Sequence, residues 1–366
     1  MHVEYAVLSL NLEDTFAISR WHYETRENLV LRIRHQGVVG YGEAAPNRRY
    51  GESLQSAQQA LPILSKTLGD RPEHFYHRLE LMQHCLAGQG AVKAALDMAL
   101  FDWLGKTLSL PVHRYFGFDP AMVPATSFTL GIAEPDKIQE KARKGSEFPF
   151  LKIKLSGEVE KDREMVRALR QVTQQPLLVD VNEAWNDPKS ALNEIYWLAD
   201  QGVMLIEQPM PSASFEDLVW LKPRSPLPLF ADESLTEPRD VVRLAEAFHG
   251  INVKIMKVGG LAEARRALET ARLLGMQTML GCMIESGLGI AAAAQLAPMV
   301  DWTDLDGNLL LAEDPCEGLV LKNSQIQLSD QPGLGVSLKP EILENLEWRA
   351  LNGTTEGDAR PIATIG

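Results

Sequence analysis

The chain has 366 residues, enough for a barrel-sized core and a second, smaller domain. Its 36 basic and 49 acidic side chains give a formal net charge of −13 without any long basic run, so nucleic acid and anionic membrane surfaces are not expected partners. No stretch approaches the ~20 apolar residues that span a bilayer. The first residues are too acidic for a signal peptide, and three widely spaced cysteines offer no disulfide framework. These features predict a cytoplasmic protein.

The N-terminal third reads as a small α+β domain. Residues 1–60 alternate between apolar and polar side chains, as strands do, with a turn at His35–Gly37. Residues 54–117 repeat their apolar side chains at helical spacing. Polar loops are expected at residues 19–27 and 46–53. We place this domain at residues 1–122.

From about Ser127 onward, strand and helix patterns alternate. Helical stretches separate eight short apolar segments, at residues 127–132, 150–156, 176–182, 203–209, 227–234, 251–257, 276–283 and 303–307. Eight strands with helical crossovers predict a (β/α)8-type (TIM-like) barrel, which we place at residues 123–315. Its last unit shows no convincing helix. The irregular segment 316–366 is expected to return to the N-terminal domain, so that both ends of the chain build an α+β capping domain.

Three carboxylates end neighbouring strands of this predicted barrel. Asp180 in PLLVDVN, Glu207 in VMLIEQP and Asp232 in LPLFADES follow one another at steps of 27 and 25 residues. Because the carboxyl ends of barrel strands meet at one mouth, the three side chains should lie together. A single strand-end carboxylate is often only a helix cap. Three in register predict a Mg²⁺ site, since this cation prefers oxygen ligands.

Lysines flank these acids on both sides. Lys152 and Lys154 share one face of their strand, and two lysines inside a buried strand are costly unless they are paired or functional. Lys254 comes 22 residues after Asp232. Strand alternation places Lys254 toward the barrel interior and Lys257 on the opposite face, where we expect it to pack or cap. Lysines beside a metal predict an enzyme that removes a proton from the carbon next to a metal-bound carboxylate.

A second acidic pair stands at the end of the eighth strand. Asp304 and Asp306, in TDLDG, lie two residues apart and therefore on one face. Asp and Gly are also common turn residues, so a simple turn is the alternative. Because the pair falls at the barrel mouth, we favour two carboxylates that hold a cationic group.

Taken together, these motifs resemble the enolase superfamily and, within it, the muconate-lactonizing subgroup. The barrel motifs are KIK at 152–154, DVN at 180–182, EQP at 207–209, ADES at 231–234 and NVKIMKVGG at 252–260. The capping-domain motifs are YGE at 41–43, RYGES at 49–53 and AALDMALFDWLGK at 94–106. GCMIES at 281–286 and DLDGNLLLAEDP at 304–315 resemble the dipeptide epimerases, which include L-Ala-D/L-Glu epimerases.

The resemblance implies a role for each site residue. Lys154 and Lys254 would be the two catalytic bases, and Asp304 and Asp306 would bind the free α-ammonium of a dipeptide. Asp180, Glu207 and Asp232 would hold Mg²⁺. The dipeptide would be lined by Thr129, Lys152, Cys282 and Ile284, the last two partly through their backbone.

Substrate specificity is expected to depend on the capping loops. Relatives that act on Ala-Glu carry an arginine in the first loop, where this chain has Tyr23. Arg20 and Arg26 lie three residues to either side, and Arg48 and Arg49 lie in the second loop. A buried substrate carboxylate needs a cationic partner, so Tyr23 predicts a substrate range broader than Ala-Glu or shifted toward hydrophobic C-terminal residues. Any of these four arginines could pair with an acidic side chain, so a preference for an acidic C-terminal residue stays open as the alternative.

The sequence therefore predicts a Mg²⁺-dependent dipeptide epimerase that inverts the α-carbon of the C-terminal residue. The reaction would be a two-base 1,1-proton transfer through an enediolate, with a small-molecule dipeptide as partner. Alternatives within the subgroup are an N-acylamino acid racemase, a cycloisomerase and an o-succinylbenzoate synthase. A non-enzymatic binding protein is disfavoured because no member of the acid–base set is missing. Homo-oligomerisation stays open, as do the dipeptide side chains and the direction of reaction.

Overall fold

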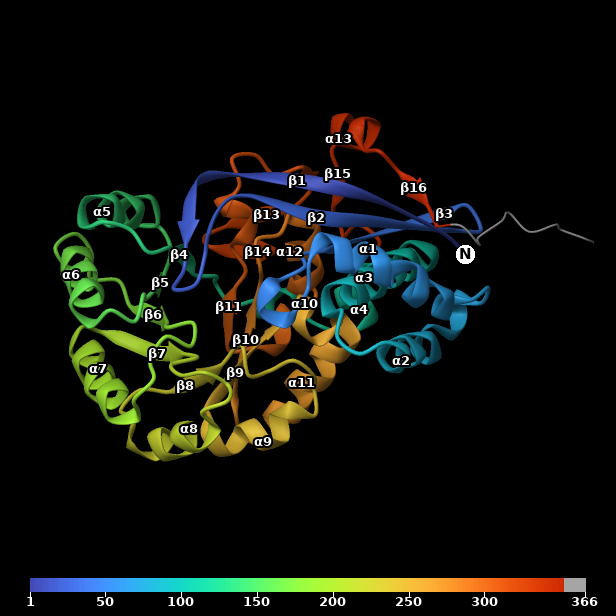
Figure 1. Cartoon of the computed structure of the whole chain (residues 1–366). Helices are drawn as coiled ribbons and strands as arrows, with labels where there is room; N and C mark the ends of the chain where they lie inside the picture. The colour runs from blue at the N-terminus through green and yellow to red at the C-terminus, as the bar shows by residue number, and fades with distance from the viewer. Residues whose placement is uncertain (352–366) are drawn as a thin grey trace, which may run out of the picture.

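The computed structural model describes residues 1–351, which form a capping domain set against a barrel (Figure 1). The capping domain contains a four-stranded antiparallel sheet in the order β16-β1-β2-β3. Its strands are β1 (His2–Ala17), β2 (His22–His35), β3 (Val38–Ala44) and β16 (Arg349–Ala350). Since β16 pairs with β1, the C-terminal segment returns to the N-terminal sheet as the sequence predicted. The predicted boundaries at 122/123 and 315/316 stay predictions, and residues 352–366 of the last segment lie outside the described residues.

The two turns of this sheet differ in how well the sequence predicted them. The β2–β3 turn contains Gln36 and Gly37, both at positive φ, which fits a two-residue hairpin of the expected kind. The predicted loop at residues 19–27 was too long, because the connection between β1 and β2 spans only residues 18–21. Beyond a register shift, Tyr23 pairs with Phe16 and extends β2 into the expected loop.

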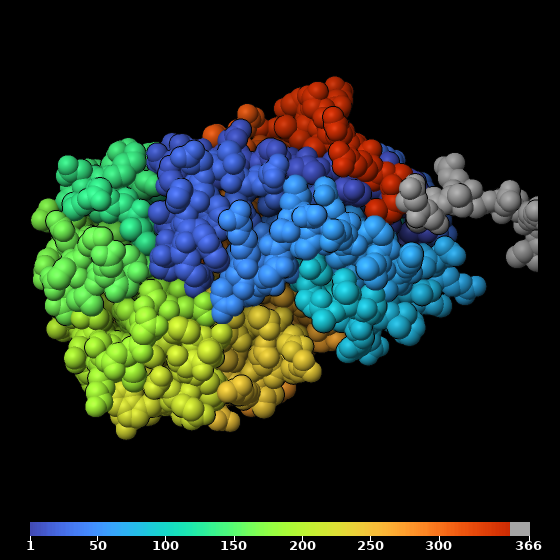
Figure 2. Space-filling view, viewed as in Figure 1, coloured from blue at the N-terminus to red at the C-terminus, as the bar shows by residue number. Residues whose placement is uncertain are grey.

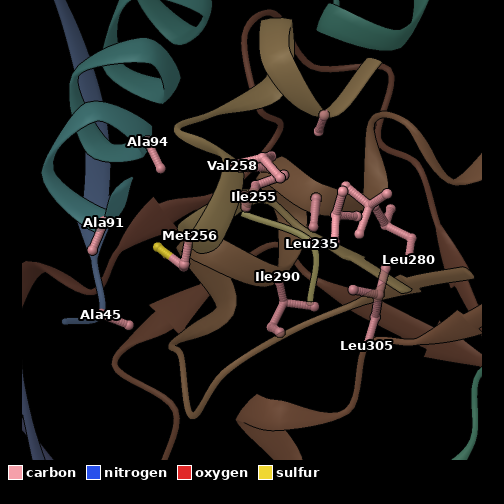
Figure 3. Packing of buried hydrophobic residues seen from close by; sticks show 14 of the residues in the cluster. Ala45, Ala91, Ala94, Leu235, Ile255, Met256, Val258, Leu280, Ile290 and Leu305 are labelled. Atoms are coloured by element: carbon pink, nitrogen blue, oxygen red, sulfur yellow. The ribbon is translucent and has the colours of Figure 1, made fainter. Parts of the chain in front are cut away.

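Four α-helices complete the capping domain between β3 and the barrel. They are α1 (Leu54–Ser65), α2 (Phe75–Cys85), α3 (Gly90–Leu108) and α4 (Val112–Tyr115). On one side α3 lies directly on the sheet, since a Cβ at Gly42 would come within 2.0 Å of the Ala95 carbonyl. On the other side α3 meets α10 (Ile255–Val258) of the barrel. Figure 3 shows Ala91 and Ala94 of α3 facing Met256, so this helix joins the two domains through small side chains.

The barrel is an eight-stranded parallel sheet in the order β4 to β11. Its strands are β4 (Phe128–Leu130), β5 (Leu151–Lys154), β6 (Leu177–Asp180), β7 (Val203–Glu207), β8 (Leu229–Ala231), β9 (Gly250–Lys254), β10 (Gln277–Gly281) and β11 (Trp302–Asp304). Each falls within or next to a predicted segment. A parallel bridge between Thr126 and Thr303 brings the first and last strands together, so the predicted barrel is confirmed.

Helices cover the outside of the barrel in chain order (Figure 1). They are α5 (Pro135–Lys144), α6 (Val159–Arg170), α7 (Pro188–Asp200), α8 (Phe215–Leu221), α9 (Asp240–Ala247), α11 (Leu261–Leu273) and α12 (Gly287–Ala294). After β11 the chain forms only a short 3₁₀ turn, Gly307–Leu310, which confirms the prediction that the eighth unit has no proper helix. The last segment adds β12 (Cys316–Glu317), β13 (Val320–Lys322), β14 (Gln325–Gln327), β15 (Ser337–Leu338) and α13 (Pro340–Asn345).

Apolar side chains fill the barrel at the amino ends of its strands. Phe150, Leu178, Leu205, Phe230 and Met279 form a cluster there, each at most 9% exposed. The charged residues at the carboxyl ends therefore stand on a packed apolar floor, which lowers the local dielectric and strengthens their interactions. Among the described residues, no helix has the length and apolarity needed to cross a membrane.

Candidate active site

Three carboxylates converge at the carboxyl ends of β6, β7 and β8. Asp180 and Glu207 are the last residues of β6 and β7, and Asp232 directly follows β8. All three side chains are at most 2% exposed. One oxygen from each lies within 4.8 Å of the others. The structure therefore gathers the three residues that the sequence singled out as metal ligands.

The environment of these carboxylates fits a divalent cation. Asn252 donates a hydrogen bond to Glu207 Oε1, and Glu207 Oε2 lies 2.7 Å from the buried Lys152 Nζ. Burial, together with the charge of Asp180, raises the pKa of Glu207 to about 7. Three buried carboxylates this close together repel one another, and a hard cation with oxygen ligands would relieve that repulsion. The three side chains are thus suited to hold Mg²⁺.

Two lysines face each other across the barrel mouth. Lys154 ends β5 and Lys254 ends β9, so three strands separate them on either way around the barrel. Lys154 Nζ lies 2.5 Å from Asp180 Oδ2, and Lys254 Nζ lies 2.9 Å from Asp232 Oδ2. Burial alone would lower the pKa of Lys254, but the charges of Asp232 and Glu207 hold this pKa above its usual range. Both amines line the same pocket.

Lys152 lies beneath that pocket as a fully buried cation. Its Nζ is 2.5 Å from Asp304 Oδ2 and 2.7 Å from Glu207 Oε2. Burial opposes its charge, but Asp304 and the neighbouring carboxylates hold the pKa of Lys152 well above its usual range. No part of Lys152 is exposed, so it is paired inside the barrel and does not face solvent.

The acidic pair on the eighth strand is divided between two environments. Asp304 is bound to Lys152 and accepts a hydrogen bond from the Ser127 hydroxyl at 2.7 Å. Asp306 accepts from the Thr129 backbone amide and hydroxyl, and no cation of residues 1–351 forms an ion pair with it. Burial and the charge of Asp304 raise the pKa of Asp306 to about 7. An unneutralised carboxylate of this kind is suited to bind a cationic group of a ligand.

A cavity of about 100 Å³ connects these groups under the capping domain. The barrel contributes Thr129, Lys154, Asp232, Lys254, Cys282, Ile284, Asp304 and Asp306 to its wall. The capping domain contributes Phe16, Ile18, Arg20, Trp21, Tyr23, Arg26, Asn47, Arg49 and Tyr50. Figure 2 shows this blue N-terminal region lying against the green and yellow barrel. Of the expected specificity residues, Arg48 alone is outside the wall and exposed to solvent.

Comparison with known proteins agrees with this geometry. Residues 4–117 match the family profile described as the mandelate racemase/muconate lactonizing enzyme N-terminal domain, and residues 136–342 match an enolase C-terminal domain-like profile. The chain belongs to the mandelate racemase/muconate lactonizing enzyme family. This membership confirms the enolase-superfamily resemblance drawn from the motifs.

Relatives within this family include epimerases and a racemase. The L-Ala-D/L-Glu epimerase of Bacteroides thetaiotaomicron is 38% identical over 92% of this chain and 88% of its own. The structure of a dipeptide epimerase from Cytophaga hutchinsonii, complexed with Mg and D-Ala-L-Val, superposes with a TM-score of 0.91. It is 27% identical and covers 96% of this chain and 99% of its own. An N-succinyl Arg/Lys racemase from Bacillus cereus is 26% identical, with a TM-score of 0.90 over 96% and 99% of the two chains.

The capping arginines of this family member fall into two groups. Arg20 forms ion pairs with Glu183 at 2.8 Å and Glu233 at 2.5 Å, and Arg49 binds Glu183 through two nitrogens at 2.6 Å. Arg26 instead donates to the Pro46 carbonyl and stacks 4.8 Å from the centre of the Tyr23 ring. Within residues 1–351, no carboxylate pairs with Arg26.

The sequence misplaced one lysine. Strand alternation put Lys257 on the face away from the site, but β9 ends at Lys254 and the chain turns into α10. On a helix, residues three apart share a face, so Lys257 also reaches Asp232, with 2.5 Å between its Nζ and Oδ1. Lys257 is fully buried behind the pocket wall and helps to neutralise Asp232. The adjacent Gly259, a helix-ending residue, was the sequence signal for this change.

Proposed function

We propose that this protein is a Mg²⁺-dependent dipeptide epimerase that inverts the α-carbon of the C-terminal residue of a dipeptide. The observation that carries the proposal is the placement of Lys154 and Lys254 on opposite sides of one pocket. Two bases facing one carbon from opposite sides allow removal of a proton on one face and delivery on the other. The same pocket contains Asp306, a carboxylate suited to a free α-ammonium.

In this mechanism each side chain has a defined task. One lysine, as the free amine, takes the α-proton at its Nζ, and the opposite lysine gives a proton from its Nζ to the other face of the carbon. Lys152 holds a fixed positive charge toward the substrate carboxylate, where negative charge develops. The capping domain covers the pocket and excludes water.

The three strand-end carboxylates would hold the metal ion. When bound, Mg²⁺ stabilises the negative charge that develops on the substrate carboxylate oxygens. The C. hutchinsonii relative was observed with Mg and a dipeptide together, which supports the same cofactor here. Asp180, Glu207 and Asp232 provide the oxygen ligands.

The alternatives within the family differ in what they require of the acidic pair. An N-acylamino acid racemase, a cycloisomerase and an o-succinylbenzoate synthase need no site for an α-ammonium. In this structure Asp306 has no cationic partner among the described residues, which favours a substrate that supplies one. A non-enzymatic binding protein with the same barrel would not need two lysines facing one pocket.

A substrate screen tests the proposed function. The protein would be incubated in D₂O with Mg²⁺ and a mixture of dipeptides, and mass spectrometry would identify those that gain one deuterium. Epimerisation exchanges the α-hydrogen with solvent, so true substrates should gain one mass unit. If no dipeptide gains deuterium while N-acylamino acids do, the protein is a racemase of the subgroup.

Blocking the substrate amine should strongly reduce turnover. N-acetylated dipeptides should have a specificity constant at least ~100-fold below that of the free dipeptides, because leaving buried carboxylates without their cation costs several kcal/mol and each 1.4 kcal/mol is tenfold. Asp306→Asn should shrink this preference, measured as the ratio of kcat/KM values. Equal turnover of both substrate types, in the wild-type enzyme, would contradict the assignment of Asp306.

The same preference should depend on pH. Asp306 binds an ammonium only when ionised, and its pKa is raised to about 7 by burial and Asp304. The kcat/KM ratio of free to N-acetylated dipeptide should therefore rise roughly tenfold from about pH 6 to about pH 7.5, as the carboxyl loses its proton. Taking the ratio cancels any effect of pH on the chemical step that both substrates share. Asp306→Asn should make the ratio independent of pH over this range.

We further propose that Arg26 favours an acidic side chain at the C-terminal position. Burial lowers the pKa of Arg26, and the guanidinium lines the pocket without a carboxylate partner among the described residues. This favours the acidic alternative over the hydrophobic range predicted from Tyr23. Arg26→Met should lower kcat/KM for Ala-Glu by ~100-fold while changing that for Ala-Leu by less than about threefold, since charge-assisted hydrogen bonds contribute roughly 1.5–3 kcal/mol. Similar losses for both dipeptides would assign Arg26 a packing role.

The location and assembly of the protein stay proposals. The net charge of −13 and the three widely spaced cysteines support a cytoplasmic enzyme. Its partner is a small molecule rather than nucleic acid or a membrane surface. A homo-oligomer stays an open alternative, which sedimentation at several protein concentrations would resolve.

A further inference from the structure

One partly buried carboxylate, Glu183, ties both capping loops to the barrel. It lies three residues after Asp180, in the loop that leaves β6. Arg49, from the loop after β3, binds both of its oxygens at 2.6 Å. Arg20, from the connection between β1 and β2, binds Glu183 Oε2 at 2.8 Å. The two loops are 29 residues apart in sequence and make no ion pair with each other in the described structure, so Glu183 is their shared anchor.

The barrel side of this contact is built to hold Glu183 in place. Asn182 and Glu183 both adopt left-handed backbone conformations, with φ of 47° and 68°, which are unfavourable for residues other than glycine. The Ser212 backbone amide donates to Glu183 Oε1 at 3.0 Å. Arg20 also donates to the Asn182 carbonyl at 2.5 Å. The contacts of Arg20, Arg49 and Ser212 therefore stabilise a strained turn that would otherwise relax.

We propose that Glu183 is a positioning residue that holds the two capping loops closed over the pocket as one unit. Arg20 and Arg49 both line the pocket wall, but their charges are directed to Glu183 and Glu233 rather than to a ligand. Their role is then to fix the loops that carry Trp21 and Tyr50, and with them Tyr23 at the start of β2, against the substrate. A bidentate pair is suited to this because it fixes orientation as well as distance.

The shared anchor makes the two loops interdependent. If Arg49 leaves, Arg20 is the one ion-pair partner that Glu183 keeps among the described residues, and if Glu183 loses its charge, both loops lose an ion pair at once. Substrate entry requires the loops to separate from the barrel. Closure and opening of the two loops should therefore be coupled through this carboxylate. This inference rests on the proposed epimerase function only where activity is measured.

Kinetics of Glu183→Gln provide the first test. The isosteric amide should raise the KM of the preferred dipeptide at least ~10-fold, the loss expected for one charge-assisted hydrogen bond, and change kcat much less. The matched control is Glu194→Gln, because Glu194 binds Arg163 through two nitrogens at 3.0 and 2.8 Å on the outer helices α6 and α7. That control should leave both constants unchanged. An equal effect of the two substitutions would overturn the proposal.

A double-mutant cycle tests the shared anchor itself. Arg49→Gln should raise KM as Glu183→Gln does, and the double variant should be no worse than the more affected single variant, because both remove one interaction. Arg49→Lys, which keeps the charge but not the bidentate geometry, should lie between wild type and Arg49→Gln. Fully additive effects would show that the two residues act independently and would overturn the proposal.

Proteolysis provides a readout that does not need activity. Trypsin cuts after arginine, and the Arg20–Trp21 bond lies in the connection between β1 and β2. Arg49→Gln leaves Arg20 in place, yet should speed cleavage at that bond if the loops are coupled through Glu183. Unchanged cleavage would overturn the coupling. Because this result is independent of turnover, it separates failure of the inference from failure of the proposed function.

Discussion

Lys154→Ala and Lys254→Ala should each abolish epimerisation, lowering kcat by at least ~10³-fold, within the range expected for loss of a general acid–base group. Each variant keeps one lysine on one side of the pocket. It should still exchange the α-proton with solvent, but only from the diastereomer whose hydrogen faces the remaining amine. The two variants should therefore exchange opposite diastereomers. Proton NMR in D₂O, starting from each pure diastereomer, measures this directly.

Lys257→Ala is the control for this experiment. Lys257 contacts Asp232 but does not line the pocket, so its loss should weaken turnover without making exchange stereoselective. Exchange of the same diastereomer by both lysine variants would contradict the opposite-face assignment. Exchange restricted to one diastereomer in Lys257→Ala would show that this residue, rather than Lys254, is the second base.

The sequence predicted the barrel and its central site because both rest on local, periodic signals. Each of the eight apolar segments is short and buried, and Asp180 and Glu207 stand at the last position of their strands. Parallel strands must place their carboxyl ends together, so the order of motifs along the chain was enough to bring the metal carboxylates and Lys154 into one site. No long-range contact had to be guessed.

The orientation of Lys257 is an example of what local sequence patterns cannot predict. Its orientation depends on whether the strand continues beyond Lys254, and a short apolar run such as INVKIMK fits a strand or the first turn of a helix equally well. The structure chooses the helix, and α3 packs against that turn from the capping domain. This contact spans residues far apart in the sequence, so strand alternation alone could not predict it.

The sequence could not distinguish the roles of the capping arginines for a related reason. Residue type and loop position made four arginines equally good candidates for contacting the substrate side chain: Arg20, Arg26, Arg48 and Arg49. What distinguishes them is pairing with carboxylates. Glu183 and Glu233, on barrel loops 134–213 residues away in sequence, neutralise Arg49 and Arg20. In the proposed assignment, specificity depends on which cations the protein leaves unneutralised, and that property emerges only when both domains are assembled.

Removal of the metal ion should abolish activity completely. Exhaustive treatment with EDTA should leave no epimerisation, and Mg²⁺ or Mn²⁺ should restore it, because without a cation the buried carboxylates Asp180, Glu207 and Asp232 would repel the substrate carboxylate. Activity assays before and after chelation measure this. Full activity after exhaustive chelation would contradict the metal role of these three residues.

Glu207→Gln should reproduce that loss without unfolding the protein. The amide keeps the shape of the side chain, relieves the repulsion among the three carboxylates and leaves Lys152 paired with Asp304, so the metal-free fold should not be destabilised. Its affinity for Mg²⁺ should fall by more than the ~10–100-fold that changes around a metal ligand usually cause. Thermal unfolding gives a measure independent of activity, since a bound ion raises the unfolding temperature with concentration. Mg²⁺ should stabilise the wild type and Glu194→Gln alike, but stabilise Glu207→Gln only at far higher concentrations. Equal stabilisation of all three would mean that the ion binds elsewhere.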